Sequence, residues 1–368
     1  MNVETNYPNT NLSGDVSSDS KINNISSILP RRQIVIAGAG SIGTIMGLMF
    51  SIQGHDVTLV RKRGKFGELD IELVGVKNLH ERIEVINSKI IFNKNEKISP
   101  DIIVLAAQRQ QLEEQLMDLH NIINFANKPI MIPIQNGLET SQVICEWMRI
   151  NKLELPIIQA IIWWSATLQS STQVLFHSEA TTSIGIPQNL ECKIASQHEY
   201  KIVKDLLFGI FETKEVDIDR ESYIKLILNV VSPVLAMVKQ PYPTGINDLK
   251  IRYIIRKLFD EVIEIGKREG WYDSDERIEN FYQVLKGEQQ LDHYSMHKQL
   301  PTHKVSSQIS AEKYGGKGSN VSLLLTFFIT HGAKLCERLM EVFLDLPPNY
   351  KAISSDQLLD LLQIEYVI

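Results

Sequence analysis

The glycine-rich segment G-A-G-S-I-G at residues 38–43 constrains the fold of this chain more than any other feature. It closes the β-branched run QIVIAGAG of residues 33–40, and such a run is typical of a strand buried on both faces. Residues 41–54 have apolar side chains at helical spacing, and residues 55–62 (HDVTLVRK) indicate a second strand. The order strand, glycine loop, helix and strand predicts a Rossmann unit.

Each glycine of this loop meets a steric need of dinucleotide binding. The first allows the tight turn, the second lets the backbone approach a pyrophosphate, and the third lets the helix pack against the strand. The free N–H groups at the start of the helix then face the phosphates. We therefore predict that the cofactor is bound by Gly38, Gly40, Ser41, Ile42 and Gly43. A structural turn without a ligand is the alternative.

Basic residues after the second strand indicate which dinucleotide is bound. Arg61 ends the strand, and Lys62 and Arg63 follow it. An NAD enzyme usually has Asp or Glu at this point to accept a hydrogen bond from the ribose 2′-hydroxyl, whereas an arginine accommodates a 2′-phosphate. The sequence therefore predicts NADP as the cofactor, with Arg61 at its 2′-phosphate. The alternative is a solvated basic turn.

Strands and helices continue to alternate through the first half of the chain. A helical segment covers residues 110–126. Apolar runs predict further strands at residues 101–108, 129–136, 156–168, 172–178 and 181–186. Such alternation predicts an α/β domain with a doubly wound parallel sheet, which we assign to residues 31–198.

The remainder of the chain differs from this pattern. After residue 198 the apolar residues recur with a helical period and strand signals fade, so we predict a helical substrate domain over residues 199–368. Residues 292–320 form a polar connection within it. Residues 1–30 are so rich in Asn, Ser, Thr and Asp that we predict a disordered tail.

Composition excludes several classes of protein. The net charge of −6 argues against a nucleic-acid partner. No uninterrupted apolar run reaches the ~18 residues of a membrane span, and the N-terminus lacks the apolar core of a signal peptide. We therefore expect a cytoplasmic chain with no membrane partner. Cys145, Cys192 and Cys336 form no C-x-x-C pair, so we expect three buried free thiols.

Four motifs in order along the chain resemble the ketopantoate reductase (2-dehydropantoate 2-reductase) family over most of residues 32–345. They are the stretch from the glycine loop to Gly64, the I-Q-N-G-L segment at residues 134–138, Lys225-x-x-x-Asn229, and the helix of residues 261–270. The resemblance implies an N-terminal Rossmann domain followed by an all-helical C-terminal domain like that of 6-phosphogluconate dehydrogenase. It also implies NADPH-dependent reduction of a 2-oxo acid.

Lys225 and Asn229 are the predicted catalytic pair. Residues four apart project from one face of a helix. Hydride delivery to a carbonyl leaves oxyanion charge, which an ammonium can stabilise and then protonate. The resemblance makes Lys225 the general acid and Asn229 the group that holds the substrate or orients the lysine. A surface lysine and a capping asparagine are the alternative, although the apolar residues around them indicate a mostly buried helix.

Asn136 lies where a strand meets a loop, the usual ligand position in open α/β sheets. The resemblance places it near the nicotinamide ribose and the substrate; an Asn-Gly turn is the alternative. Gln108, which we assign to the cofactor site, stands where the family usually has a lysine. By the same resemblance, Ser306 or Ser307 corresponds to a serine of the family and would bind the substrate carboxylate.

Some departures from the family pattern concern the substrate. Residues 317–320 (KGSN) replace a T-E-x-D segment whose Glu contacts a substrate hydroxyl, and Pro233 replaces an asparagine. Lost polar partners change specificity sharply. A 2-oxo acid therefore stays the predicted substrate class, and ketopantoate is one member of it. Two alternatives are a dinucleotide-binding sensor without turnover and a dehydrogenase of an opine-like substrate.

Other patterns are weaker. Tyr294 and Lys298 match the Y-x-x-x-K pair of short-chain dehydrogenases, but they lie in the helical half. No acidic or cysteine ligand stands near the histidines of this segment, so no metal is predicted; they are His293, His297 and His303. Residues 323–329 could form a homodimer or a core helix. Trp163 and Trp164, if on a strand, face opposite sides.

Overall fold

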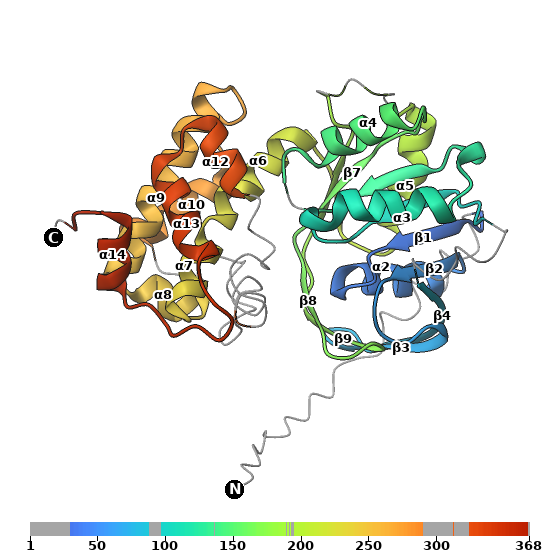
Figure 1. The fold of residues 1–368 in the computed structure, drawn as a ribbon, viewed down its shortest axis with the longest axis horizontal. Helices are drawn as coiled ribbons and strands as arrows, with labels where there is room; N and C mark the ends of the chain where they lie inside the picture. Colours follow the sequence, from blue (N-terminus) through green and yellow to red (C-terminus); the bar gives the residue numbers. More distant parts are fainter. Residues whose placement is uncertain are drawn as a thin grey trace, which may run out of the picture.

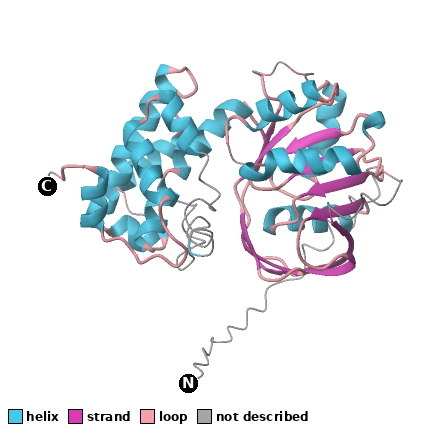
Figure 2. Ribbon diagram, viewed as in Figure 1, coloured by secondary structure: helices cyan, strands magenta, loops and turns pink. Residues whose placement is uncertain are grey.

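The structure is a computed structural model that describes residues 30–87, 97–135, 137–188, 190, 192, 195–289, 312 and 324–366. Figure 1 shows two lobes, one formed by the first part of the chain and one by the last, with α6 between them. Figure 2 shows that the strands lie in the first lobe and that the second is helical. The predicted tail falls almost wholly outside the described residues, and the 292–320 segment has only Glu312 within them.

Parallel strands form the centre of an eight-stranded sheet of order β6-β5-β1-β2-β4-β3-β9-β8. β1 (Gln33–Ala37) pairs in parallel with β2 (Asp56–Arg61) and with β5 (Ile102–Leu105), and β5 pairs in parallel with β6 (Ile130–Pro133). Strands β5 and β6 are buried along their whole length. These are the strands that the continuous apolar runs predict, because a strand covered on both faces needs no polar alternation.

Helices cover both faces of this sheet, as the doubly wound prediction requires. On one face, Ile34 and Ile36 share a hydrophobic core with α2 (Ser41–Ile52). On the other, Val35 and Ala37 share a core with α3 (Leu112–Ile122) and α4 (Thr140–Ile150). Alternate residues of one strand thus serve two different cores.

An antiparallel hairpin that extends the sheet is absent from the sequence prediction, whereas the strand that follows it in the sheet, at residues 173–178, was predicted. β3 (Gly67–Gly75) and β4 (Leu79–Asn87) form an antiparallel pair, and β3 continues the sheet to β9 (Gln173–Ser178) and β8 (Ser165–Leu168). In β3 and β4 buried residues alternate with exposed, often charged ones. A strand with one solvated face lacks the apolar run that marked the central strands.

A smaller sheet of order β11-β10-β7 lies beside the first. It contains β7 (Gln159–Ile162), β10 (Thr182–Gly185) and β11 (Thr213–Glu215). The single strand predicted at residues 156–168 is therefore two strands, β7 and β8, in different sheets. The break falls at Trp163 and Trp164.

The two tryptophans face opposite ways, as predicted. Trp163 packs against the helical core, whereas Trp164 lies inside the α/β core and stacks on Phe211. α5 (Gln197–Phe208) also packs into the α/β core, and β11 pairs with β10. The helical part accordingly begins near residue 218, later than the 198/199 division that we drew from the sequence.

The helical lobe is built around the amphipathic helix α9 (Leu249–Arg268). One face of α9, with Ile254, Leu258 and Val262 fully buried, joins the core of this lobe. The other helices are α6 (Ile218–Asn229), α7 (Val231–Val238), α8 (Tyr242–Asn247), α10 (Glu276–Lys286), α12 (Leu324–His331), α13 (Lys334–Leu344) and α14 (Ser355–Leu362).

Two apolar segments of this lobe are core helices. The stretch Ile218–Val238 is long and apolar enough to cross a membrane, yet 78% of its apolar 18-residue window is buried inside the protein. Its two helices meet where Pro233, lacking an N–H, cannot donate to the carbonyl of Asn229. α12 buries Phe327 and Phe328 in the same core and exposes Ile329. The core-helix interpretation of the 323–329 segment thus has direct support.

The expectation of three free thiols was wrong for two of them. Cys145 and Cys192 form a disulfide, with their Cα atoms 5.4 Å apart. They are separated by 47 residues in the sequence, and the fold brings α4 next to the loop before α5. Spacing along the chain could not reveal this proximity. Cys336 is free and buried, as expected.

Candidate functional site

The glycine loop has the geometry of a dinucleotide-binding turn. Gly38 has φ +96°, and a Cβ there would lie 2.3 Å from the backbone nitrogen of Ala107. A Cβ at Gly43 would lie 2.3 Å from the carbonyl oxygen of Gly38. At Gly40 a Cβ would meet no atom of the described residues within 4 Å. Packing within the protein explains the first and third glycines, whereas the open space at Gly40 suits a ligand.

The start of α2 completes this part of the site. Gly40 is its N-cap and supplies no side-chain hydrogen bond to the first turn, which begins at Ser41 and Ile42 and contains no acidic residue. The positive end of the helix therefore meets no protein carboxylate in that turn. The structure brings the five predicted phosphate-binding residues together at the carboxyl end of β1. These residues fit the pyrophosphate of a dinucleotide.

Gln108 lies beside this loop. It follows β5, the neighbour of β1, and it precedes the short helix η2 (Arg109–Gln111). Gly38 approaches Ala106 and Ala107, the two residues before it. The side chain of Gln108 is exposed, so it is available to a bound cofactor.

The Arg61 side chain is hydrogen-bonded within the protein, which the sequence did not indicate. Its side chain is buried, and its guanidinium donates to the carbonyl oxygens of Ser171, at 2.7 Å, and of Lys65. Burial lowers the pKa of this guanidinium. Arg61 therefore holds the turn after β2 in shape. Arg63 in that turn is exposed and has no ion pair with another described residue.

Lys225 lies where the helical lobe meets the small sheet. Its ammonium donates to the carbonyl oxygen of Ile162, at the end of β7, and lies 4.9 Å from the centre of the Trp163 ring. The side chain is partly buried. Burial lowers the pKa of Lys225 to about 8, although Glu221 acts in the opposite direction. A lysine with this pKa can donate a proton near neutral pH.

Glu221, one helical turn before Lys225, is the centre of a polar network that the sequence analysis missed. Arg277 of α10 forms a two-pronged ion pair with it, with distances of 2.8 and 2.6 Å. Trp163 Nε1 and Ser183 Oγ each donate to its carboxylate at 2.9 Å. The side chains come from α6, α10, β10 and the segment between β7 and β8, so no local motif marked them.

A second polar connection runs beside the first. Gln159 of β7 accepts a hydrogen bond from Ser141 of α4 at 2.7 Å and donates to Ser222 of α6 at 3.0 Å. Together the two networks fix α6 against the α/β lobe. Both lie near the carboxyl end of β6, because β7 follows a parallel bridge between Met131 and Ile157.

The carboxyl end of β6 carries the Q-N-G segment. Asn136 itself lies outside the described residues, as do Ser306 and Ser307, so their predicted roles stay predictions. Gln135 is buried, and its side-chain amide has no hydrogen-bond partner in the part of the chain that the structure describes. A bound ligand would satisfy such an amide. The sequence motif contained Gln135, but nothing in it singled out this residue.

Asn229 ends α6 one turn beyond Lys225 and is partly buried. The spacing places both side chains on the same face of the helix, as predicted. Among described residues, no group of three or more His, Cys, Asp or Glu is placed to hold a metal ion. The predicted pair Lys225 and Asn229 thus shares its helix face with Glu221.

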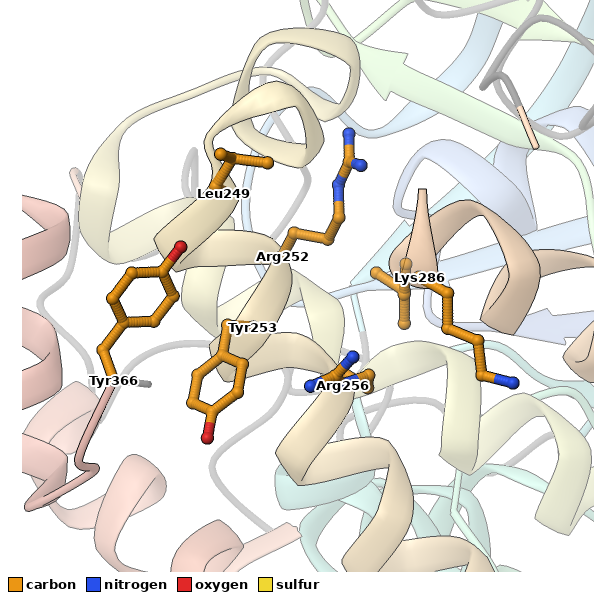
Figure 3. Close-up of a pocket in the computed structure, with 7 residues that line it drawn as sticks. Leu249, Arg252, Tyr253, Arg256, Lys286 and Tyr366 are labelled. Atoms are coloured by element: carbon orange, nitrogen blue, oxygen red, sulfur yellow. The ribbon is translucent and has the colours of Figure 1, made fainter. Parts of the chain in front are cut away.

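A pocket of about 210 Å³ lies at the far end of α10 from this network (Figure 3). Lys286 and Arg277 are nine residues apart on α10, or about 14 Å along the helix. The cations of the pocket have structural roles. Arg252 donates to the Ile246 carbonyl at 2.9 Å, Arg256 packs on Tyr253, and Lys286 packs on Tyr282. This pocket is separate from the site around Lys225.

The fold and the glycine loop define a two-domain chain in which a Rossmann-type sheet is joined to a helical domain. Residues 34–189 match the family model "Ketopantoate reductase PanE/ApbA". This match covers less than half of the chain. A 2-dehydropantoate 2-reductase from Pyrococcus abyssi is 29% identical over 118 residues, which are 31% of this chain and 36% of that protein. The match therefore spans about a third of this curated relative.

Solved structures share the fold over both lobes. A PanE/ApbA family ketopantoate reductase from Ralstonia eutropha has a TM-score of 0.63 at 17% identity and covers 84% of this chain and 95% of its own. A 2-dehydropantoate 2-reductase from Geobacter metallireducens has 0.64 at 14%, covering 84% and 99%. D-mandelate dehydrogenase, solved with NADH and anilino(oxo)acetate, has 0.62 at 18%, covering 84% and 96%. The Rossmann sheet followed by a helical domain is thereby confirmed.

Proposed function

We propose that this protein reduces a small 2-oxo acid to the 2-hydroxy acid with a nicotinamide cofactor, as a ketopantoate reductase does. The position of Lys225 carries the proposal. Its ammonium lies at the end of β7, the neighbour of β6, whose own end carries Gln135 and Asn136. The glycine loop lies at the same edge of the large sheet, because parallel strands have their carboxyl ends on one side.

The residues of the chain have distinct roles in this reaction. Gly38, Gly40, Gly43 and the start of α2 hold the pyrophosphate, and a bound reduced nicotinamide supplies the hydride. Lys225 has two N–H groups left after its bond to Ile162, and these can stabilise the developing oxyanion and protonate it. Asn229 binds the substrate from the same helix face. Gln135 and Asn136 orient the reacting groups.

We propose NADP rather than NAD, since the turn after β2 is basic and β2 does not end in a carboxylate. Because Arg61 already binds two backbone carbonyls, Arg63 is the better candidate for the 2′-phosphate. Ser306 or Ser307 would bind the substrate carboxylate. We further propose that the protein acts in the cytoplasm, in keeping with the burial of its most apolar helical stretch. A homodimer is an additional proposal, which sedimentation would test.

The test is consumption of NADPH and of NADH by the purified protein across a panel of 2-oxo acids. The panel includes ketopantoate, benzoylformate and short unbranched acids. The proposal predicts turnover of at least one acid, with NADPH preferred. Tight NADPH binding without turnover of any acid would contradict it and favour the sensor alternative. Turnover only when an amine accompanies the oxo acid would indicate opine-type chemistry.

A further inference from the structure

The carboxylate of Glu221 is arranged differently from that of an ordinary ion-pair partner of a lysine. It lies four residues before Lys225 on α6, but all the contacts that hold it come from other groups. Its Oε1 accepts from Trp163, Ser183 and Arg277, and its Oε2 accepts from Arg277. The lone pairs of the carboxylate are thus largely used. The ammonium of Lys225 bonds to the Ile162 carbonyl instead.

The charged surroundings of Lys225 are few. On its own helix there is Glu221, and from α10 there is Arg277, whose guanidinium also pairs with Asp275 at 2.9 Å. Lys225 and Arg277 both lie over the ring of Trp163, at 4.9 and 5.1 Å from its centre. Of the described residues of β7 and β10, those bonded to this network contribute neutral groups, the Ile162 carbonyl and the Ser183 hydroxyl.

We propose that Glu221 is a positioning residue for the reaction, clamped by Arg277, Trp163 and Ser183 so that its charge keeps the Lys225 ammonium protonated without occupying its donors. A direct salt bridge would use the N–H groups that the substrate needs. A carboxylate fixed nearby gives the electrostatic benefit and leaves those donors free. This inference rests on the proposed function of Lys225 as the proton donor.

Two neutralising substitutions should act in opposite directions. Glu221→Gln removes the negative charge and leaves Arg277 to repel the lysine, so the pKa of Lys225 falls. Arg277→Gln leaves the carboxylate unopposed, so the pKa rises. The alkaline limb of kcat/KM should therefore move down by about one pH unit in the first variant and up by about one in the second. Arg277→Lys keeps the charge and should leave the limb close to its wild-type position.

A direct readout separates this inference from the proposed function. The rate at which acetic anhydride acetylates Lys225, followed by mass spectrometry against pH, reports the fraction of free amine without any substrate. We expect the midpoint near pH 8 in the wild type, lower in Glu221→Gln and higher in Arg277→Gln. Asp273→Asn, which breaks an exposed pair with Arg220, is the matched control and should leave the midpoint unchanged.

Circular dichroism and NADPH binding establish that each variant is folded. Folded variants whose acetylation midpoints and kinetic limbs do not move, or move in the same direction, would overturn the role of Glu221. If instead the midpoints move as expected but Lys225→Ala turns over normally, the electrostatic coupling stands and the proposed function of the lysine fails. The two failures are thus distinguishable.

Discussion

The glycine loop and the lysine network are two halves of one candidate site, and they are built in different ways. The loop is a contiguous run of six residues, and backbone packing explains two of its glycines: Gly38 and Gly43 have no room for a Cβ. The network joins side chains from four separate parts of the chain, and charge and hydrogen bonding hold it together. The glycine loop should therefore be sensitive to substitutions that add side-chain volume, and the lysine network to substitutions that change charge.

The largest expected effect concerns the network. Lys225→Ala should reduce turnover by about 10²–10⁴-fold, the usual contribution of a positioned general acid, because no other described group donates a proton at the end of β7. NADPH binding should stay within about twofold of the wild type, since the glycine loop is untouched. Stopped-flow consumption of NADPH and fluorescence titration measure the two quantities. Equal losses in both would show that the halves are not separable.

Substitutions in the glycine loop should instead weaken NADPH binding. Gly38→Ala places a Cβ against the backbone of Ala107 at a positive φ, so we expect a loss of about 3 kcal/mol of stability and about 100-fold weaker NADPH binding. Gly40→Ala is the matched control: its Cβ meets no atom of the described residues within 4 Å, so the fold should be unaffected while binding still weakens. Thermal unfolding distinguishes them. Equal melting temperatures for both variants would contradict the steric account.

The charge on the Glu221 carboxylate should make the stability of the folded protein depend on pH. Burial raises the pKa of Glu221, but the hydrogen bonds from Arg277, Ser183 and Trp163 outweigh it and leave the pKa below its ordinary value of 4.5. A lowered carboxyl pKa stabilises the fold above pH 4.5, and this contribution is lost as the pH falls through the folded-state value.

Glu221→Gln should accordingly cost about 2 kcal/mol at pH 7, less than a fully buried pair, because the Arg277 side chain is 39% exposed. The difference from the wild type should shrink as the pH is lowered from 5 to 3. Urea unfolding over this range measures it. A difference that stays constant with pH would mean that the carboxylate charge is not responsible.

The smallest expected effect concerns cofactor choice. Arg63→Ala should reduce the preference for NADPH over NADH by about tenfold, the cost of one charge-assisted contact to a phosphate. Arg61→Ala should instead lower stability, because its guanidinium holds the carbonyls of Ser171 and Lys65. Kinetics with both cofactors and thermal unfolding test the pair. If cofactor preference changed only in Arg61→Ala, Arg61 rather than Arg63 would be the residue that binds the 2′-phosphate.

The sequence predicted the features that depend on consecutive residues or on a fixed spacing along one helix. The central strands, α2 and the loop carry their evidence in consecutive residues, and Lys225 and Asn229 in a fixed helical spacing. The hairpin β3–β4 was missed because its outer face is polar. Glu221, Arg277 and Ser183 were missed because only the folded chain brings them to Trp163. The Cys145–Cys192 disulfide escaped prediction for the same reason.

The most direct test of the account is the fate of the hydride. The 2-oxo acid with the highest turnover would be reduced with NADPH that carries deuterium at C4, in the 4R and the 4S form separately, and the product analysed by mass spectrometry. The account predicts one deuterium at C2 of the hydroxy acid from one of the two forms. Oxidation of both forms with no deuterium in the acid would contradict direct hydride transfer at this site.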